Sequence, residues 1–177
     1  MSARRPAAAL LAATTLSLVT TSAYAVDRVR VSDPIGDAQV APGGATLAQV
    51  AAVDLTAVSY TLGDEALTII TVVDDLSRTP GNEFIDTEVS EGDLSISLTT
   101  EVGKAKVKVF DGSHYYVCRG SSARAGFGAD RMVQVVPLEC LSAFEAPRLR
   151  TTAGLYEDDA TPIVVDRAPR TGVVTLP

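Results

Sequence analysis

Three aspartates near the start of the chain have the residue type and spacing of a cation site. Asp33 and Asp37 belong to the segment Asp-Pro-Ile-Gly-Asp, and Asp54 opens the second apolar stretch. Hard oxygen ligands that converge from loops suit Ca²⁺, so the pattern predicts a metal site of Asp33, Asp37 and Asp54. The same residues can simply build a turn, since Asp side chains cap backbone N–H groups and Gly36 tolerates positive φ. The segment lacks the residue order of an EF-hand loop.

A second acidic stretch runs from Asp74 to Asp93, where seven acidic residues accompany Arg78 alone. We interpret it as a loop of 20 residues, which is long for a connection between strands. A solvated loop and a binding site for cations or basic partners both remain open. Residues 156–159, Tyr-Glu-Asp-Asp, form a shorter acidic loop with the same two interpretations.

The aromatic side chains offer a second kind of site. Tyr115 and Tyr116 follow His114 in a short predicted strand, and one of the two rings must face outward because side chains alternate across a strand. These three residues are the candidate ligand-binding group. The chain has no Trp, and an exposed ring can equally cover a neighbouring strand.

Catalysis finds little support in the pattern. His114 is the one histidine of the chain, and no G-x-S-x-G nucleophile elbow is present. Gly120-Ser121-Ser122 does not match that motif. The sequence therefore names no catalytic residue and favours a protein that is not an enzyme. A small secreted hydrolase that uses His114 is the alternative.

The first 25 residues have the layout of a secretory signal peptide. Arg4 and Arg5 precede an apolar run from Ala7 to Val19, and the segment ends in Ala23-Tyr24-Ala25. We expect cleavage after Ala25, release of a secreted, extracellular bacterial protein, and no attachment to a membrane afterwards. The mature chain would then be a single domain of residues 26–177.

Charge narrows the choice of partners. Without the two arginines of the signal peptide, 13 basic residues face 22 acidic ones, a net charge of −9. Such a surface repels phosphate backbones and anionic lipid, which argues against nucleic acid and membrane as partners. It tolerates bound cations, so Ca²⁺ is the candidate cofactor.

Cys118 and Cys140 are the only cysteines. An even count in an exported chain predicts a disulfide, and the spacing does not match a C-x-x-C redox pair.

Apolar residues mostly recur at every second position, which is the strand signature. Residues 58–62 and 67–73 form a predicted hairpin around Gly63-Asp64-Glu65, and residues 94–99 begin a second one. The pattern predicts an all-β fold, an antiparallel β-sandwich of jelly-roll or immunoglobulin-like type with about eight or nine strands.

The segments Asp33-Pro-Ile-Gly-Asp37, Asp54-Leu-Thr and residues 67–75, together with Val-Pro-Leu-Glu-Cys-Leu at 136–141, resemble a known bacterial pattern. They are similar to secreted β-sandwich proteins of the DOMON and family-9 carbohydrate-binding-module type, in an uncharacterised branch. The resemblance implies a jelly-roll-like sandwich, structural calcium in some members, and a carbohydrate or cell-envelope component as candidate ligand.

These patterns together favour an exported, non-catalytic binding or envelope-associated module stabilised by calcium. A structural surface or assembly protein is a further alternative. The ligand, the strand order and the oligomeric state do not follow from the sequence.

Overall fold

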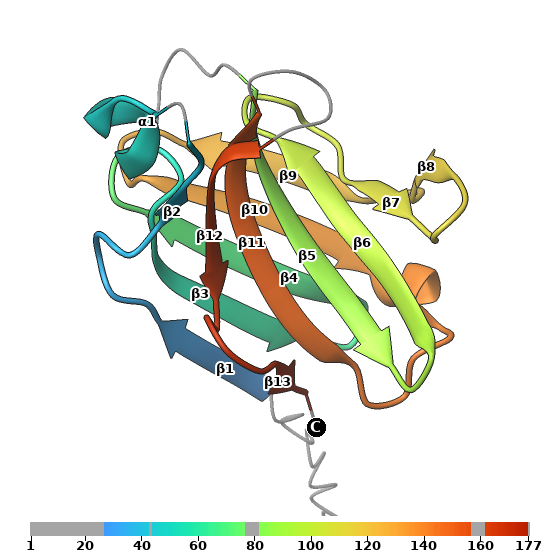
Figure 1. Ribbon diagram of the computed structural model, residues 1–177. Coiled ribbons are helices and arrows are strands. Elements are labelled where there is room, and N and C mark those ends of the chain that lie inside the picture. Colours follow the sequence, from blue (N-terminus) through green and yellow to red (C-terminus); the bar gives the residue numbers. More distant parts are fainter. Residues whose placement is uncertain (1–26, 43, 77–81, 157–161, 177) are drawn as a thin grey trace, which may run out of the picture.

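The computed structural model describes residues 27–42, 44–76, 82–156 and 162–176 (Figure 1). The predicted signal peptide therefore lies outside the described residues. The described chain folds into two antiparallel sheets that pack face to face. The predicted all-β sandwich is confirmed. No helix among the described residues is long and apolar enough to cross a membrane.

The smaller sheet has five strands in the order β1-β3-β4-β10-β9. Their bounds are β1 (Asp27–Ser32), β3 (Leu55–Leu62), β4 (Ala66–Val73), β10 (Arg131–Pro137) and β9 (Ser122–Gly126).

The larger sheet has eight strands, and seven of them follow the order β2-β12-β11-β5-β6-β7-β8. The eighth strand, β13 (Val174–Thr175), pairs with β11. The other bounds are β2 (Gln39–Val40), β12 (Pro162–Ala168), β11 (Arg148–Tyr156), β5 (Glu83–Glu91), β6 (Leu94–Glu101), β7 (Lys108–Phe110) and β8 (Tyr115–Val117).

Two short helices connect the strands. The α-helix α1 (Leu47–Ala51) begins with a capping box between Thr46 and Gln49, and the 3₁₀ helix η1 (Leu138–Leu141) follows β10. The end of α1 fixes the position of Asp54, whose backbone N–H donates to Val50 O at 2.9 Å.

Alternation of side chains builds the core between the sheets. In β11, Leu149, Thr151 and Ala153 are fully buried, while their neighbours in sequence face the solvent side. Two polar contacts join the sheets inside this core. Tyr60 Oη lies 2.9 Å from Thr151 Oγ1, and Gln134 Nε2 donates to Thr100 Oγ1 at 2.9 Å.

The described chain has 13 strands, more than the eight or nine predicted. Strand β8 is the predicted short strand after His114, whereas β2 has only two residues, which is too short for a periodic pattern to reveal. The predicted first hairpin is confirmed, with Leu62 paired to Leu67.

The interpretation of residues 74–93 as one long loop is wrong. Residues 83–91 form strand β5, in which Ile85, Thr87 and Val89 face the core. The acidic residues Asp86 and Glu88 alternate with them on the outer face, so the acidic composition concealed the period of two. Of the two predicted acidic loops, residues 77–81 and 157–161 lie outside the described part of the chain.

Candidate functional site

An aspartate cluster forms at one end of the sandwich, beside α1. Asp33 and Asp37 lie on the connection from β1 to β2, which turns at Gly36 with φ +86°. The Gly36 N–H donates to Asp54 Oδ2 at 2.6 Å, so the turn is fastened to the residue that precedes β3.

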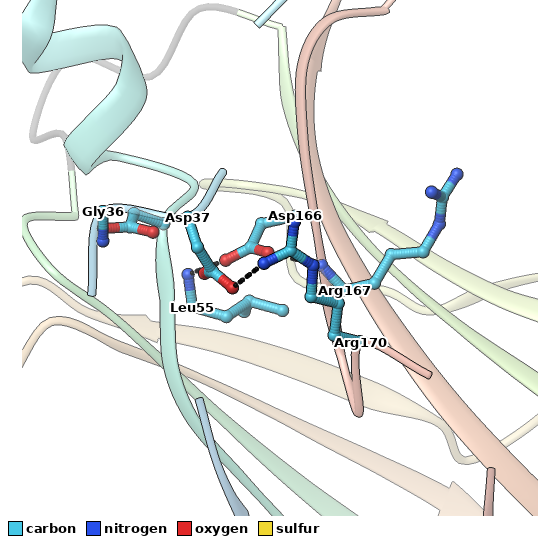
Figure 2. A network of polar contacts seen from close by, with 7 residues as sticks. Gly36, Asp37, Leu55, Asp166, Arg167 and Arg170 are labelled. Carbon is cyan, nitrogen blue, oxygen red and sulfur yellow. Dashed lines mark hydrogen bonds and ion pairs between the residues drawn. The ribbon is translucent and has the colours of Figure 1, made fainter. Parts of the chain in front are cut away.

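Asp166 joins the cluster from β12 in the other sheet, as Figure 2 shows. Its Oδ2 accepts the N–H of Leu55 at 2.7 Å, and its Oδ1 accepts the N–H of Arg167 at 2.7 Å. One carboxylate oxygen from each of Asp33, Asp37 and Asp166 lies within 4.8 Å of the other two. We call Asp33, Asp37, Asp54 and Asp166 the aspartate cluster.

Among the described residues, one ion pair compensates part of the cluster's negative charge. Arg170 Nη1 lies 3.0 Å from Asp37 Oδ2. Burial raises the pKa of Asp33 to about 6, and the charges of Asp166, Asp37 and Asp54 act in the same direction. Burial also raises the pKa of Asp166. The cluster therefore brings several carboxylates close together in a partly buried place, and this raises the pKa values of Asp33 and Asp166.

Three oxygens of the cluster have no hydrogen-bond partner among the described residues: Asp33 Oδ2, Asp37 Oδ1 and Asp54 Oδ1. Asp54 is 98% buried, and a buried carboxylate oxygen without a partner is costly. A cavity of about 20 Å³ adjoins Asp37 and Asp166 on the side of Arg167 and Arg170, and it has room for one water molecule. The side chains of the cluster fit a hard cation, because all of them offer carboxylate oxygens and three of these oxygens have no hydrogen-bond partner among the described residues.

Of the predicted metal site, the structure brings the oxygens of Asp33 and Asp37 together, and the third converging oxygen comes from Asp166. Asp54 lies outside that converging set and holds the turn through Gly36 N–H. Asp166 was not predicted from the sequence. A signal for it exists, since Val164, Asp166 and Ala168 all face inward on β12. A charged side chain at an inward-facing position of a strand needs a partner, so Asp166 in this alternation indicates a site.

Without metal, the free energy of unfolding should fall as pH rises from about 4 to above 6. Asp33 keeps its proton in the folded chain up to its raised pKa of about 6, whereas the unfolded chain releases it near 3.8. Ionisation in this window therefore favours unfolding. The raised pKa values of Asp86 and Asp166 act in the same direction. The lowered pKa values of Glu101 and Asp111 oppose it, but solvent screens these exposed groups.

Denaturant unfolding in chelator at several pH values between about 4 and 7 measures this slope. Asp33→Asn should flatten it, because asparagine does not titrate. A wild-type stability that rises steadily through the window would contradict the prediction.

A second candidate site is a pocket of about 600 Å³ on the outer face of the larger sheet. Its lining side chains come from β5, β6, β7, β8 and β11, with Asn82 just before β5. They are Asn82, Phe84, Asp86, Ser97, Thr99, Glu101, Lys108, Tyr115 and Tyr156.

Phe84 and Tyr156 form one wall of this pocket. Their rings stack with centroids 4.4 Å apart at an interplanar angle of 22°. The Phe84 ring lies over Gly154, where a Cβ would overlap Phe84 Cζ and lie 3.2 Å from Val164 O. The glycine therefore lets the aromatic wall rest directly on the sheet.

The polar side of the pocket carries one compensated pair of charges and one further carboxylate, that of Asp86. Lys108 Nζ lies 2.5 Å from Glu101 Oε1, so these two charges compensate each other. Asp86 Oδ1 accepts a hydrogen bond from Thr99 Oγ1 at 2.7 Å. Burial raises the pKa of Asp86.

The structure separates the three predicted ligand-binding residues. Tyr115 lines the pocket, and its ring packs against that of Phe110, its cross-strand partner, with the ring centroids 4.6 Å apart. Tyr116 pairs with the buried Val109 and so faces the other side of the sheet, where the edge position leaves it 44% exposed. His114 lies in the exposed turn before β8 and does not line the pocket.

The His114 imidazole makes no hydrogen bond or ion pair with any side chain in the described residues, although its backbone N–H donates to Asp111 Oδ1 at 2.8 Å.

No protein-family model and no curated protein matches the chain. The resemblance to the DOMON and carbohydrate-binding-module group stays a prediction.

Proposed function

We propose that this chain is an exported, non-catalytic β-sandwich module that binds one calcium ion at the aspartate cluster. The observation that carries the proposal is the convergence of three carboxylate oxygens, one each from Asp33, Asp37 and Asp166, within 4.8 Å of one another. Asp33 Oδ2 and Asp37 Oδ1 are buried without a hydrogen-bond partner among the described residues, and a bound ion would give them one.

The composition of the cluster favours calcium over other metals. The three residues whose oxygens converge are all aspartates, and no His or Cys accompanies them. Zinc and copper sites usually include imidazole or thiolate, whereas Ca²⁺ takes oxygens in flexible geometry. Mg²⁺ is less suited, because it demands a near-octahedral shell and gives up its water reluctantly.

Binding here would stabilise the contact between the two sheets. Asp33 follows β1 and Asp54 precedes β3, both in the smaller sheet. Asp37 precedes β2 and Asp166 belongs to β12, both in the larger sheet. A shared ion would thus hold the strands of both layers together at this end of the sandwich.

Thermal unfolding with calcium and with chelator tests the proposal. At a calcium concentration about 100 times the dissociation constant, we expect Tm to rise by roughly 5–10 °C, since an ion bound only to the folded chain stabilises it by mass action. Magnesium at the same concentration should give a smaller rise.

The variant Asp33→Asn separates a metal ligand from a turn residue. In chelator its Tm should equal or exceed that of the wild type, because one of the repelling charges is gone. The rise with calcium should largely disappear. Asp64→Asn, in the exposed turn between β3 and β4, is the matched control and should keep the full rise. An equal Tm of the wild type in calcium and chelator would refute the proposal.

A further inference from the structure

We infer that the pocket on the outer face of the larger sheet binds an organic cation, an ammonium group carried on an apolar or hydroxylated skeleton. This names the ligand class of the binding module and so rests on the proposed function. The pocket shares no residue with the aspartate cluster, so the two can be tested separately.

Charge gives the first reason. Glu101 and Lys108 neutralise each other within the pocket, and Glu88 on the adjoining surface pairs with Arg150 at 2.7 Å. Asp86 is the pocket-lining carboxylate that has no cationic partner among the described residues. The pocket therefore has a net charge of −1 and favours a positive ligand.

The surroundings of Asp86 give the second reason. Asp86 is partly buried on β5, where Thr99 donates a side-chain hydrogen bond to it at 2.7 Å and the Ser97 hydroxyl also favours its charged form. Its burial weakens hydration of the carboxylate, which is why its pKa is raised. An ammonium group with N–H bonds would replace the lost hydration with charge-assisted hydrogen bonds, which are stronger than neutral ones, and a quaternary ammonium would gain the charge attraction alone. The hydroxyl of Ser97, on the neighbouring strand, supplies a further acceptor within the same pocket.

The aromatic side chains decide between an organic and an inorganic cation. Phe84, Tyr156 and Tyr115 contribute ring surface to the pocket. Ring faces attract ammonium groups and cover the carbon atoms attached to them. A bare metal ion gains no oxygen ligand from Phe84 and would find Asp86 as its one uncompensated carboxylate. A volume of about 600 Å³ also matches sites for small organic molecules.

Calorimetric titration of the mature chain with two matched pairs of ligands tests the inference. The pairs are glucosamine with glucose, and choline with its uncharged carbon isostere, dimethylbutanol. Each pair differs mainly in the positive charge. We expect at least one cation to bind about 10-fold or more tightly than its neutral partner at physiological ionic strength.

Asp86→Asn should weaken cation binding about 10-fold or more while its circular dichroism stays that of the wild type, since asparagine can still accept from Thr99. Asp93→Asn removes the same charge from the exposed turn between β5 and β6 and should leave binding unchanged. Tyr115→Ala, at a site 66% exposed, should weaken binding without unfolding the chain.

Three outcomes would overturn the inference: equal binding of cation and neutral partner, binding of glucose alone, or no binding of either pair. If any of these occurs while the calcium-dependent rise in Tm persists, the inference fails and the calcium proposal stands. Cation binding that depends on Asp86, without a calcium effect on Tm, would refute the calcium proposal and support the inference.

Discussion

Tyr60→Ala should lower the free energy of unfolding by about 3–5 kcal/mol, as typical for truncation of a large buried aromatic side chain. Tyr60 is fully buried in β3, between the two sheets. The substitution leaves a cavity that the surrounding strands can only partly close. It also removes the hydroxyl that lies 2.9 Å from Thr151 Oγ1 and 3.4 Å from Ala168 O.

Denaturant unfolding followed by circular dichroism measures this loss, and Tyr60→Phe divides it into two parts. The phenylalanine variant keeps the ring, so it should lose only about 1 kcal/mol for the hydrogen bond. Thr151 keeps its contact with Thr87 Oγ1 at 2.8 Å in that variant. Tyr116→Ala, at a partly exposed ring, should change stability by less than about 1 kcal/mol. A loss below about 1 kcal/mol in Tyr60→Ala would contradict the core position of this residue.

The hydroxyl contacts of Tyr60 also explain how the sheets are aligned. Apolar side chains can slide past one another with little change in energy, whereas a buried hydrogen bond has one good geometry. Tyr60 connects β3 to β11, and Gln134 connects β10 to β6 through Thr100 and Leu98 O. These contacts join both sheets at two separate places in the core, which favours one packing arrangement over its neighbours.

Local pattern was sufficient to predict most of the fold. The hairpin of β3 and β4 follows from two apolar runs around Gly63-Asp64-Glu65, and the structure pairs these two strands across that turn. The sequence did not reveal β5, because Asp86 and Glu88 occupy the outer face of a central strand. Their charges are acceptable there since that face lines a pocket and is not covered by another layer.

The candidate sites show where sequence reasoning stops. Asp33 and Asp37 are close in sequence, so their proximity was predictable. The contact between Leu55 and Asp166 joins residues 111 positions apart, and it depends on how the two sheets pack. The pocket likewise combines Phe84 and Asp86 with Tyr156 from another strand. No local pattern indicates which strands become neighbours.

Removal of the disulfide by Cys118→Ala with Cys140→Ala should lower the free energy of unfolding by about 3 kcal/mol in the chain-entropy model. The structure joins these two cysteines, as the sequence predicts, across a separation of 22 residues. The bond limits the conformations of the unfolded chain, and its removal restores them. Denaturant unfolding of the double variant against the oxidised wild type measures the loss. A change below about 1 kcal/mol would contradict the prediction.

The location of the bond predicts where the variant loosens first. Cys118 follows β8, and Cys140 lies in η1. All three residues of β8 are exposed, so this strand has little core contact of its own and depends on the bond to stay beside the sandwich. Hydrogen exchange should therefore show faster exchange in β7 and β8 of the variant, while β3, β4 and β10 remain protected. Because Tyr115 lies on β8 and lines the pocket, cation binding should weaken together with that protection. Uniformly faster exchange across both sheets would show instead that the bond stabilises the whole sandwich and not this edge.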